Sequence, residues 1–193
     1  MKQKQSRTEK KKASNTAPTA RSVRWASVKA IALFALYALV LFGLIYTPFA
    51  KRVAVDPLTD FVARSAGWLF HLFGADVSGA GTTVTVNGVS LSIAFGCNGV
   101  EALAIYIAAL LAAPFSWRSK GWGLLVGIVG NFIINQIRVM GLFLAAMIGP
   151  QEFEYAHKIV GQTFVIVLSM GLFLWWGSRY GQGGKAKTKP VLA

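Results

Sequence analysis

The chain has 193 residues, of which 54% are hydrophobic and only 14% charged, yet its formal net charge is +13. This balance excludes an ordinary soluble domain and predicts a small polytopic membrane protein. One cysteine and two histidines exclude an intramolecular disulfide and a closed zinc site, so we expect neither metal nor cofactor.

The basic residues gather in two polar tails that flank the apolar segments. Residues 1–27 carry lysine and arginine among small polar residues, and such a segment cannot bury enough surface to fold, so we predict a disordered tail. Residues 179–193 form a second basic tail. Because both tails flank apolar spans, their charge indicates membrane topology, and we expect no nucleic-acid partner. The chain thus divides into two cytoplasmic tails and a membrane-embedded domain over residues 28–178.

In chain order, the first apolar run covers residues 28–50 and is too long for a signal peptide, so it predicts an uncleaved crossing. Residues 58–73 mix aromatic side chains with Asp60, Arg64 and His71 and predict a short helix at the membrane interface. Residues 82–93 alternate β-branched and polar side chains around Asn87-Gly88, which predicts a type I′ β-hairpin outside the hydrocarbon.

Three more apolar segments follow, over residues 100–113, 122–148 and 159–177. The predicted fold is therefore an all-α polytopic membrane protein with four transmembrane helices, an additional short interfacial helix and a small extracytoplasmic β-hairpin. The positive-inside rule places both basic tails, Arg118 and Lys120 in the cytoplasm, and most acidic residues outside. A fifth crossing over residues 58–73 would reverse this charge pattern.

The single cysteine, Cys97, lies in a glycine-flanked turn at the start of the segment 100–113. A thiol at a helix N-terminus faces the positive end of the helix dipole, which favours the nucleophilic thiolate. A lone cysteine is more often an inert small hydrophobe, so its role depends on its neighbours.

Helix rise gives the depth of those neighbours. At about 1.5 Å per residue, the stretches from Cys97 to Pro114 and from Gly121 to Arg138 are about 25 Å long, and that from His157 to Arg179 is about 33 Å. A hydrocarbon core is about 30 Å thick, so all three side chains reach the outer interface from three helices. Taken singly, His157 is an ordinary interfacial histidine, as we expect for His71.

Polar residues beside this level suggest supporting roles. Asn131, Asn135 and Arg138 fall at i, i+4 and i+7 and form one stripe that faces the bundle. Hydrogen bonding between helices is the simpler explanation for Asn131, whereas Asn135 fits either role. Glu101 lies one turn after Cys97 inside the membrane and needs a partner, for which we expect Arg138.

Two functions of other classes fit some of these residues. A small transporter or channel would use the intramembrane polar residues as a pathway but would not depend on a thiol. A non-enzymatic membrane assembly protein would use the hairpin as a docking edge. The dependence of function on Cys97 separates both from an enzyme.

The segments Phe95-Gly96-Cys97-Asn98-Gly99-Val100-Glu101, Asn135-Gln136-Ile137-Arg138 and Glu154-Tyr155-Ala156-His157 resemble the exosortase/archaeosortase family of membrane cysteine transpeptidases. The resemblance covers about residues 76–177 and is greatest to the exosortase H branch.

This resemblance implies a multi-pass protein of the bacterial inner membrane with its active site facing the periplasm. It implies partners that are exported proteins with a C-terminal motif, a transmembrane helix and a basic tail. Cys97, Arg138 and His157 would be catalytic, with Glu101, Asn135 and Asn131 in support, and cleavage through a thioester would end in transfer to an acceptor or in hydrolysis. The oligomeric state does not follow from the sequence.

Overall fold

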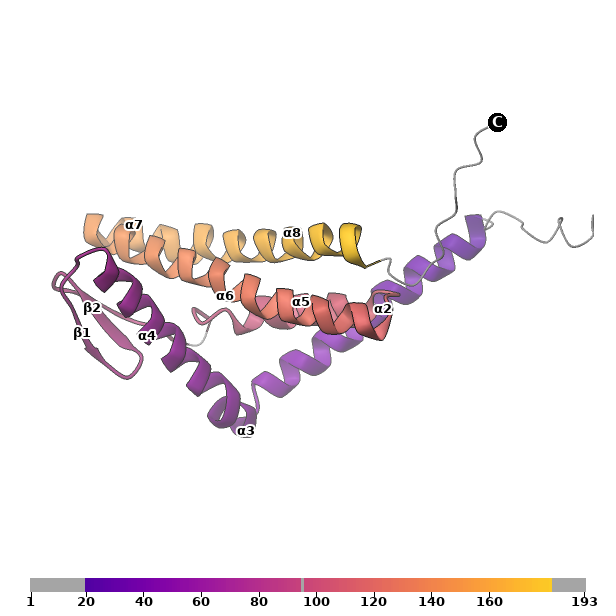
Figure 1. Ribbon diagram of the computed structural model, residues 1–193, viewed down its shortest axis with the longest axis horizontal. Coiled ribbons are helices and arrows are strands. Elements are labelled where there is room, and N and C mark those ends of the chain that lie inside the picture. Colours follow the sequence, from indigo (N-terminus) through magenta and orange to yellow (C-terminus); the bar gives the residue numbers. More distant parts are fainter. Residues whose placement is uncertain (1–19, 95, 182–193) are drawn as a thin grey trace, which may run out of the picture.

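The computed structural model describes residues 20–94 and 96–181, so most of both predicted basic tails lies outside the described residues. The described chain is mostly helical, with one small sheet (Figure 1). In chain order its elements are α2 (Ala20–Ile45), α3 (Pro48–Ala50), the π-helical segment η1 (Lys51–Val55), α4 (Asp56–Leu72), β1 (Val77–Ala80), β2 (Thr83–Val86), β3 (Val89–Ser92), α5 (Val100–Ala112), α6 (Trp117–Ile148), α7 (Pro150–Tyr155), the π-helical segment η2 (Ala156–Gly161) and α8 (Gln162–Tyr180).

Three helical stretches of the described chain are long and apolar enough to cross a membrane: Ser27–Ile45, Trp117–Ile148 and Pro150–Tyr180. The fourth predicted crossing is α5, which has only 13 residues. At about 1.5 Å per residue it is roughly 20 Å long, less than a typical hydrocarbon core. It contacts α2, α6 and α8. The prediction of four crossings is thus supported for three helices, while the fourth is a short helix packed among them.

The first crossing differs from its predicted bounds at both ends. Its helix begins at Ala20, inside the segment predicted to be disordered, and ends at Ile45 instead of residue 50. The early end has a local cause, because Pro48 disfavours helical backbone at the preceding Thr47. Thr47 is extended and its Oγ1 accepts a hydrogen bond from Ala50 N at 3.2 Å, which caps α3. The chain therefore turns here (Figure 1) and continues into α4.

The sheet contains the predicted hairpin as two of its three antiparallel strands, in the order β1-β2-β3. Asn87 and Gly88 have φ values of 50° and 84°, and a type I′ turn requires positive φ at both positions. The prediction of an all-α fold with only a hairpin is therefore wrong in one respect, because β1 was missed. Its Val-Ser-Gly-Ala sequence lacks the alternating β-branched pattern that identified the other two strands.

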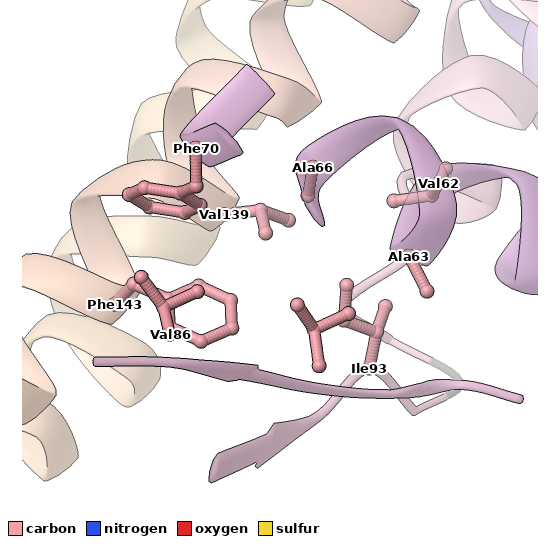
Figure 2. Close-up of a cluster of buried hydrophobic side chains, with 9 residues drawn as sticks. Val62, Ala63, Ala66, Phe70, Val86, Ile93, Val139 and Phe143 are labelled. Carbon is pink, nitrogen blue, oxygen red and sulfur yellow. The ribbon is translucent and has the colours of Figure 1, made fainter. Parts of the chain in front are cut away.

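The predicted interfacial helix is α4, and its apolar face packs on protein. Val62, Ala63, Ala66 and Phe70 are at most 6% exposed. They meet side chains of the sheet and of α6 in one hydrophobic core (Figure 2). The Phe70 and Phe143 rings make an edge-on contact with centroids 5.1 Å apart, a geometry that adds to the burial energy. This core fixes the sheet, and hence the chain leading to Cys97, against α6.

A second core holds α5, α6 and α8 together around Tyr106, Leu110 and Trp176. The Tyr106 ring lies against α6 where Gly127 leaves room for it, since a Cβ at Gly127 would approach the ring to 2.1 Å. The Tyr106 hydroxyl donates to Gly123 O at 2.9 Å, so its polar atom is satisfied within the bundle. Close packing through glycine is typical of helices in membranes and sets the height of α6 beside α5.

Candidate active site

The turn that carries Cys97 is held by hydrogen bonds at both ends. Cys97 N donates to Ala94 O at 2.9 Å. The Asn98 side chain is 3% exposed, donates to Thr59 Oγ1 of α4 at 2.8 Å and accepts from Val100 N at 3.2 Å. The second bond satisfies one of the free N–H groups at the start of α5. Cys97 thus lies in a fixed turn between β3 and α5 that is hydrogen-bonded to α4.

Two glycines in this turn have left-handed backbone, with φ of 90° at Gly96 and 79° at Gly99. A Cβ at Gly99 would also lie 2.9 Å from Asn135 Cγ, whereas a Cβ at Gly96 would meet nothing within 4 Å. Backbone strain therefore acts at both positions, but overlap with α6 acts only at Gly99.

We expect Gly99→Ala to lower the free energy of unfolding by roughly 2–4 kcal/mol, because strain and overlap add. Gly96→Ala is the matched control, and strain alone predicts a loss of roughly 1 kcal/mol there. Thermal unfolding of the two purified variants in detergent measures the difference. Equal losses would show that the contact of Gly99 with Asn135 does not constrain the turn.

The structure brings the thiol and the imidazole together. Cys97 Sγ lies 2.9 Å from His157 Nε2, although the residues are 60 positions apart in the chain. The His157 ring stacks on Phe153, with centroids 5.6 Å apart and an interplanar angle of 23°. Cys97 and His157 both border a cavity of about 40 Å³, which is also lined by residues from the end of β3 and from α6. The stacked ring is therefore oriented toward the thiol.

His157 belongs to η2, a π-helical turn between α7 and α8. The predicted crossing covers residues 159–177 and its depth was measured along a helix from His157, whereas the observed helical stretch runs from Pro150 to Tyr180. Single π turns within α-helices are uncommon and are frequently found at functional sites. The wider turn sets the direction of the His157 side chain.

Arg138 completes the group from the interior of α6. Its side chain is 6% exposed, and its Nη1 donates to Gly96 O at 3.0 Å. Its Nη2 lies 3.9 Å from Cys97 Sγ. Gly161 leaves room for the guanidinium, because a Cβ there would lie 2.9 Å from Arg138 Nε. Among the described residues no carboxylate forms an ion pair with Arg138, so its charge acts on the thiol and its surroundings.

The expectation of an activated thiolate from the helix dipole is not supported. Burial raises the pKa of the Cys97 thiol, and the nearby Arg138 charge lowers it by less. Desolvation opposes ionisation of a thiol, and here it outweighs the favourable charge. The pKa of this thiol therefore lies above that of an ordinary cysteine, and a base in contact would assist its ionisation. His157 is in contact and is suited to that task.

The predicted pairing of Glu101 with Arg138 is wrong. Glu101 Oε1 accepts a hydrogen bond from the Tyr46 hydroxyl at 3.1 Å, at the point where α2 ends. Tyr46 lies 55 positions earlier in the chain, and no sequence pattern connects the two residues. Glu101 thus links the start of α5 to the break that follows α2.

The two asparagines of the polar stripe have different contacts. Asn135 is 1% exposed and donates from Nδ2 to Cys97 O at 3.2 Å, so it holds the backbone of the nucleophile candidate. Asn131 donates to Gly127 O at 2.8 Å and accepts a short bond from Ser169 Oγ of α8. Asn131 therefore makes the helix-to-helix contact that its position favoured, and Asn135 belongs to the site.

Sequence reasoning missed several residues that build this site. Thr59 accepts a hydrogen bond from Asn98 and donates to Val55 O at 2.7 Å. Gln136 holds α6 to α4 by donating to Ser65 Oγ at 2.8 Å. Asn98 directly follows Cys97 in the sequence, and this position could have identified it as a residue of the site. The pairings of Thr59 and Gln136 depend on how α4 folds back, which the sequence does not encode locally.

The chain matches a known protein family. The family described as "Transmembrane exosortase (Exosortase_EpsH)" matches residues 19–175, which is most of the chain. This stretch includes Cys97, Arg138 and His157 and all the elements that position them. No curated protein and no solved structure matches.

Proposed function

Because this chain belongs to the transmembrane exosortase family, we propose that it is a membrane-embedded cysteine transpeptidase or peptidase that removes the C-terminal sorting signal of exported proteins. The contact between Cys97 Sγ and His157 Nε2 at 2.9 Å, next to buried Arg138, carries the proposal. A nucleophile, a base in hydrogen-bond reach and a fixed positive charge are the parts that acyl transfer requires.

In the proposed reaction the Cys97 thiol proton passes to His157 Nε2 as sulfur attacks the scissile carbonyl carbon. The tetrahedral intermediate collapses, the C–N bond breaks, and His157 returns the proton to the leaving amine. This gives a thioester on Cys97 and a free C-terminal sorting signal. An acceptor amine or a water molecule then attacks the thioester carbonyl, with His157 as base, and restores the thiol.

Arg138 is proposed to stabilise the oxyanion that forms on the scissile carbonyl. Its Nη2 is 3.9 Å from Cys97 Sγ, so a carbonyl carbon bonded to sulfur would place its oxygen close to the guanidinium. One such donor in a buried site contributes roughly 3–4 kcal/mol to lowering the barrier. Asn135 and Gly96 act on Cys97 and Arg138 through the backbone and are proposed as positioning groups.

The transporter hypothesis loses its main support. It needs polar side chains that line a pathway, but Asn131 and Asn135 are 3% and 1% exposed and bind Ser169 and the Cys97 backbone. Polar groups bonded within the bundle hold helices together. The assembly hypothesis gives no reason for the thiol, imidazole and guanidinium to meet.

We propose that the site faces the periplasm of the bacterial inner membrane. The beginnings of α2 and α6 and the end of α8 lie at one end of the structure, and α7 and the sheet lie at the other (Figure 1). Arg24, Arg118 and Arg179 belong to the first end, and Glu152 and Glu154 to the second. By the positive-inside rule the first end would be cytoplasmic, which is the side predicted for both basic tails.

The direct test is co-expression of the chain with a precursor. The probe is a tagged exported protein encoded near this gene that ends in an apolar stretch and a basic tail. We expect loss of its C-terminal segment only when the chain is present, detected as a shift on immunoblots and as a new C-terminus by mass spectrometry. A precursor that stays intact beside normal levels of the chain contradicts the proposal.

Labelling of Cys97 tests the orientation and the state of the thiol. Since Cys97 is the only cysteine, a membrane-impermeant maleimide added outside intact spheroplasts is expected to label it. Because the pKa of Cys97 is raised, its thiolate fraction at pH 7 is smaller than that of an ordinary thiol with pKa about 8.5. The labelling rate should therefore keep rising above pH 9. Labelling only from the cytoplasmic side would reverse the orientation.

A further inference from the structure

The inference that follows rests on the proposed function and concerns the outer edge of the sheet. In the order β1-β2-β3, one side of β3 pairs with β2, and no other described strand pairs with its second side. Ile93 N donates to Thr82 O, so the backbone of Ile93 points toward β2. Backbone groups alternate along a strand, so Leu91 and Val89 also point toward β2. The N–H and C=O of Ser90 and Ser92 therefore point outward.

This edge leads directly to the thiol. Leu91, Ser92 and Ile93 border the same cavity as Cys97 and His157. The strand is fixed at its end, because Ile93, which directly follows β3, is buried in the core against α4 and α6 (Figure 2), whereas Ser90 and Ser92 are exposed. An edge with free backbone groups is a template for a further strand. A chain lying on it would end beside Cys97.

We propose that the segment of the exported protein just before the scissile bond binds as a fourth strand along β3. Its direction follows from the topology. The exported part of the substrate comes from the periplasmic side, its scissile bond must reach Cys97, and its membrane helix continues beyond. Because β3 also runs toward Cys97, the added strand lies parallel to β3, with Ser90 and Ser92 bonding to its backbone. Recognition thus relies on an extended backbone, and side chains add selectivity.

Disulfide trapping tests the placement and the direction. Cys97→Ala removes the only cysteine. A single new cysteine is then introduced on β3, as Ser90→Cys or Ser92→Cys. The control is Ser78→Cys, which lies on the opposite edge of the sheet. The probe is the tagged precursor of the cleavage assay, with single cysteines at each of the six residues before its apolar stretch. We expect trapping at alternate precursor positions, with Ser92→Cys reacting nearer the apolar stretch than Ser90→Cys.

Three results would overturn the inference. The first is trapping in the reverse order of precursor positions, which means an antiparallel strand, and the second is equal trapping by Ser78→Cys. The third is no trapping from β3 although the wild-type chain cleaves the precursor. Trapping uses the Cys97→Ala protein and so measures binding alone. If the wild-type chain does not cleave the precursor, the proposed function fails, while ordered trapping would still support the binding mode.

A backbone substitution gives a second readout. Ser92→Pro and Ser92→Ala both lack the hydroxyl, but only proline removes the outward N–H, and proline is tolerated at such edge positions. We expect Ser92→Pro to cleave the precursor about tenfold more slowly than Ser92→Ala, which corresponds to one lost backbone hydrogen bond. Equal rates, in proteins with matching thermal unfolding, would overturn the role of this N–H.

Discussion

Replacement of Cys97 by alanine is expected to abolish processing of the precursor while the protein stays in the membrane at its normal level. In the proposed mechanism sulfur forms the bond to the scissile carbon, and no other side chain of the site is proposed to replace it. The loss should be at least about a thousandfold, as for removal of a nucleophile in other acyl-transfer enzymes. The measurement is the fraction of precursor cleaved over time in membranes that contain equal amounts of each protein.

Cys97→Ser is the informative companion. It keeps the size of the side chain and a hydrogen bond to His157, but a hydroxyl is far harder to ionise than a thiol. Activity near that of Cys97→Ala is expected. If either variant processes the precursor at the wild-type rate, Cys97 is not the nucleophile, and the proposed function would have no chemical centre.

The second large effect is expected from His157→Gln. Glutamine retains a hydrogen-bonding group beside the sulfur but cannot carry a proton, so both activation of the thiol and protonation of the leaving amine are lost. General acid–base catalysis by a positioned histidine contributes roughly a hundredfold to ten-thousandfold. Because burial raises the pKa of Cys97, the residual activity should rise with pH as the thiol ionises without help.

The chain supplies its own control for this variant. His71 is the only other histidine, and it lies exposed on α4 beside a separate cavity between α4 and β1. His71→Gln should process the precursor at the wild-type rate. Equal losses in the two variants would indicate a general effect on folding, and an unimpaired His157→Gln would remove the imidazole from the mechanism.

The sequence predicted the meeting of the three side chains better than it predicted their partners. Helix rise placed Cys97, Arg138 and His157 at one depth, and the observed contacts agree. The depth of a residue can be predicted in this way because the rise per residue of a helix is constant and the bilayer thickness fixes the length of a crossing. Depth says nothing about the direction of a side chain, so it could not predict the pairing of Glu101 with Tyr46 instead of Arg138.

Local patterns also explain which elements were found. The Asn87-Gly88 turn and its flanking β-branched residues identified β2 and β3, but β1 joins them only because the sheet supplies a partner. The mostly apolar composition of residues 28–50 predicts one continuous crossing, whereas Thr47 and Pro48 end α2. Hydropathy measures burial preference and is insensitive to a single proline.

The π turn at η2 has a consequence for the evolution of chain length in this region. The wider turn accommodates one surplus residue within Ala156–Gly161. Loss of one residue from this segment would let it close to an α-helix while α7 and α8 keep their places, and His157 would then lose the direction that the π turn gives its side chain. Length here should consequently be far less tolerant of change than composition.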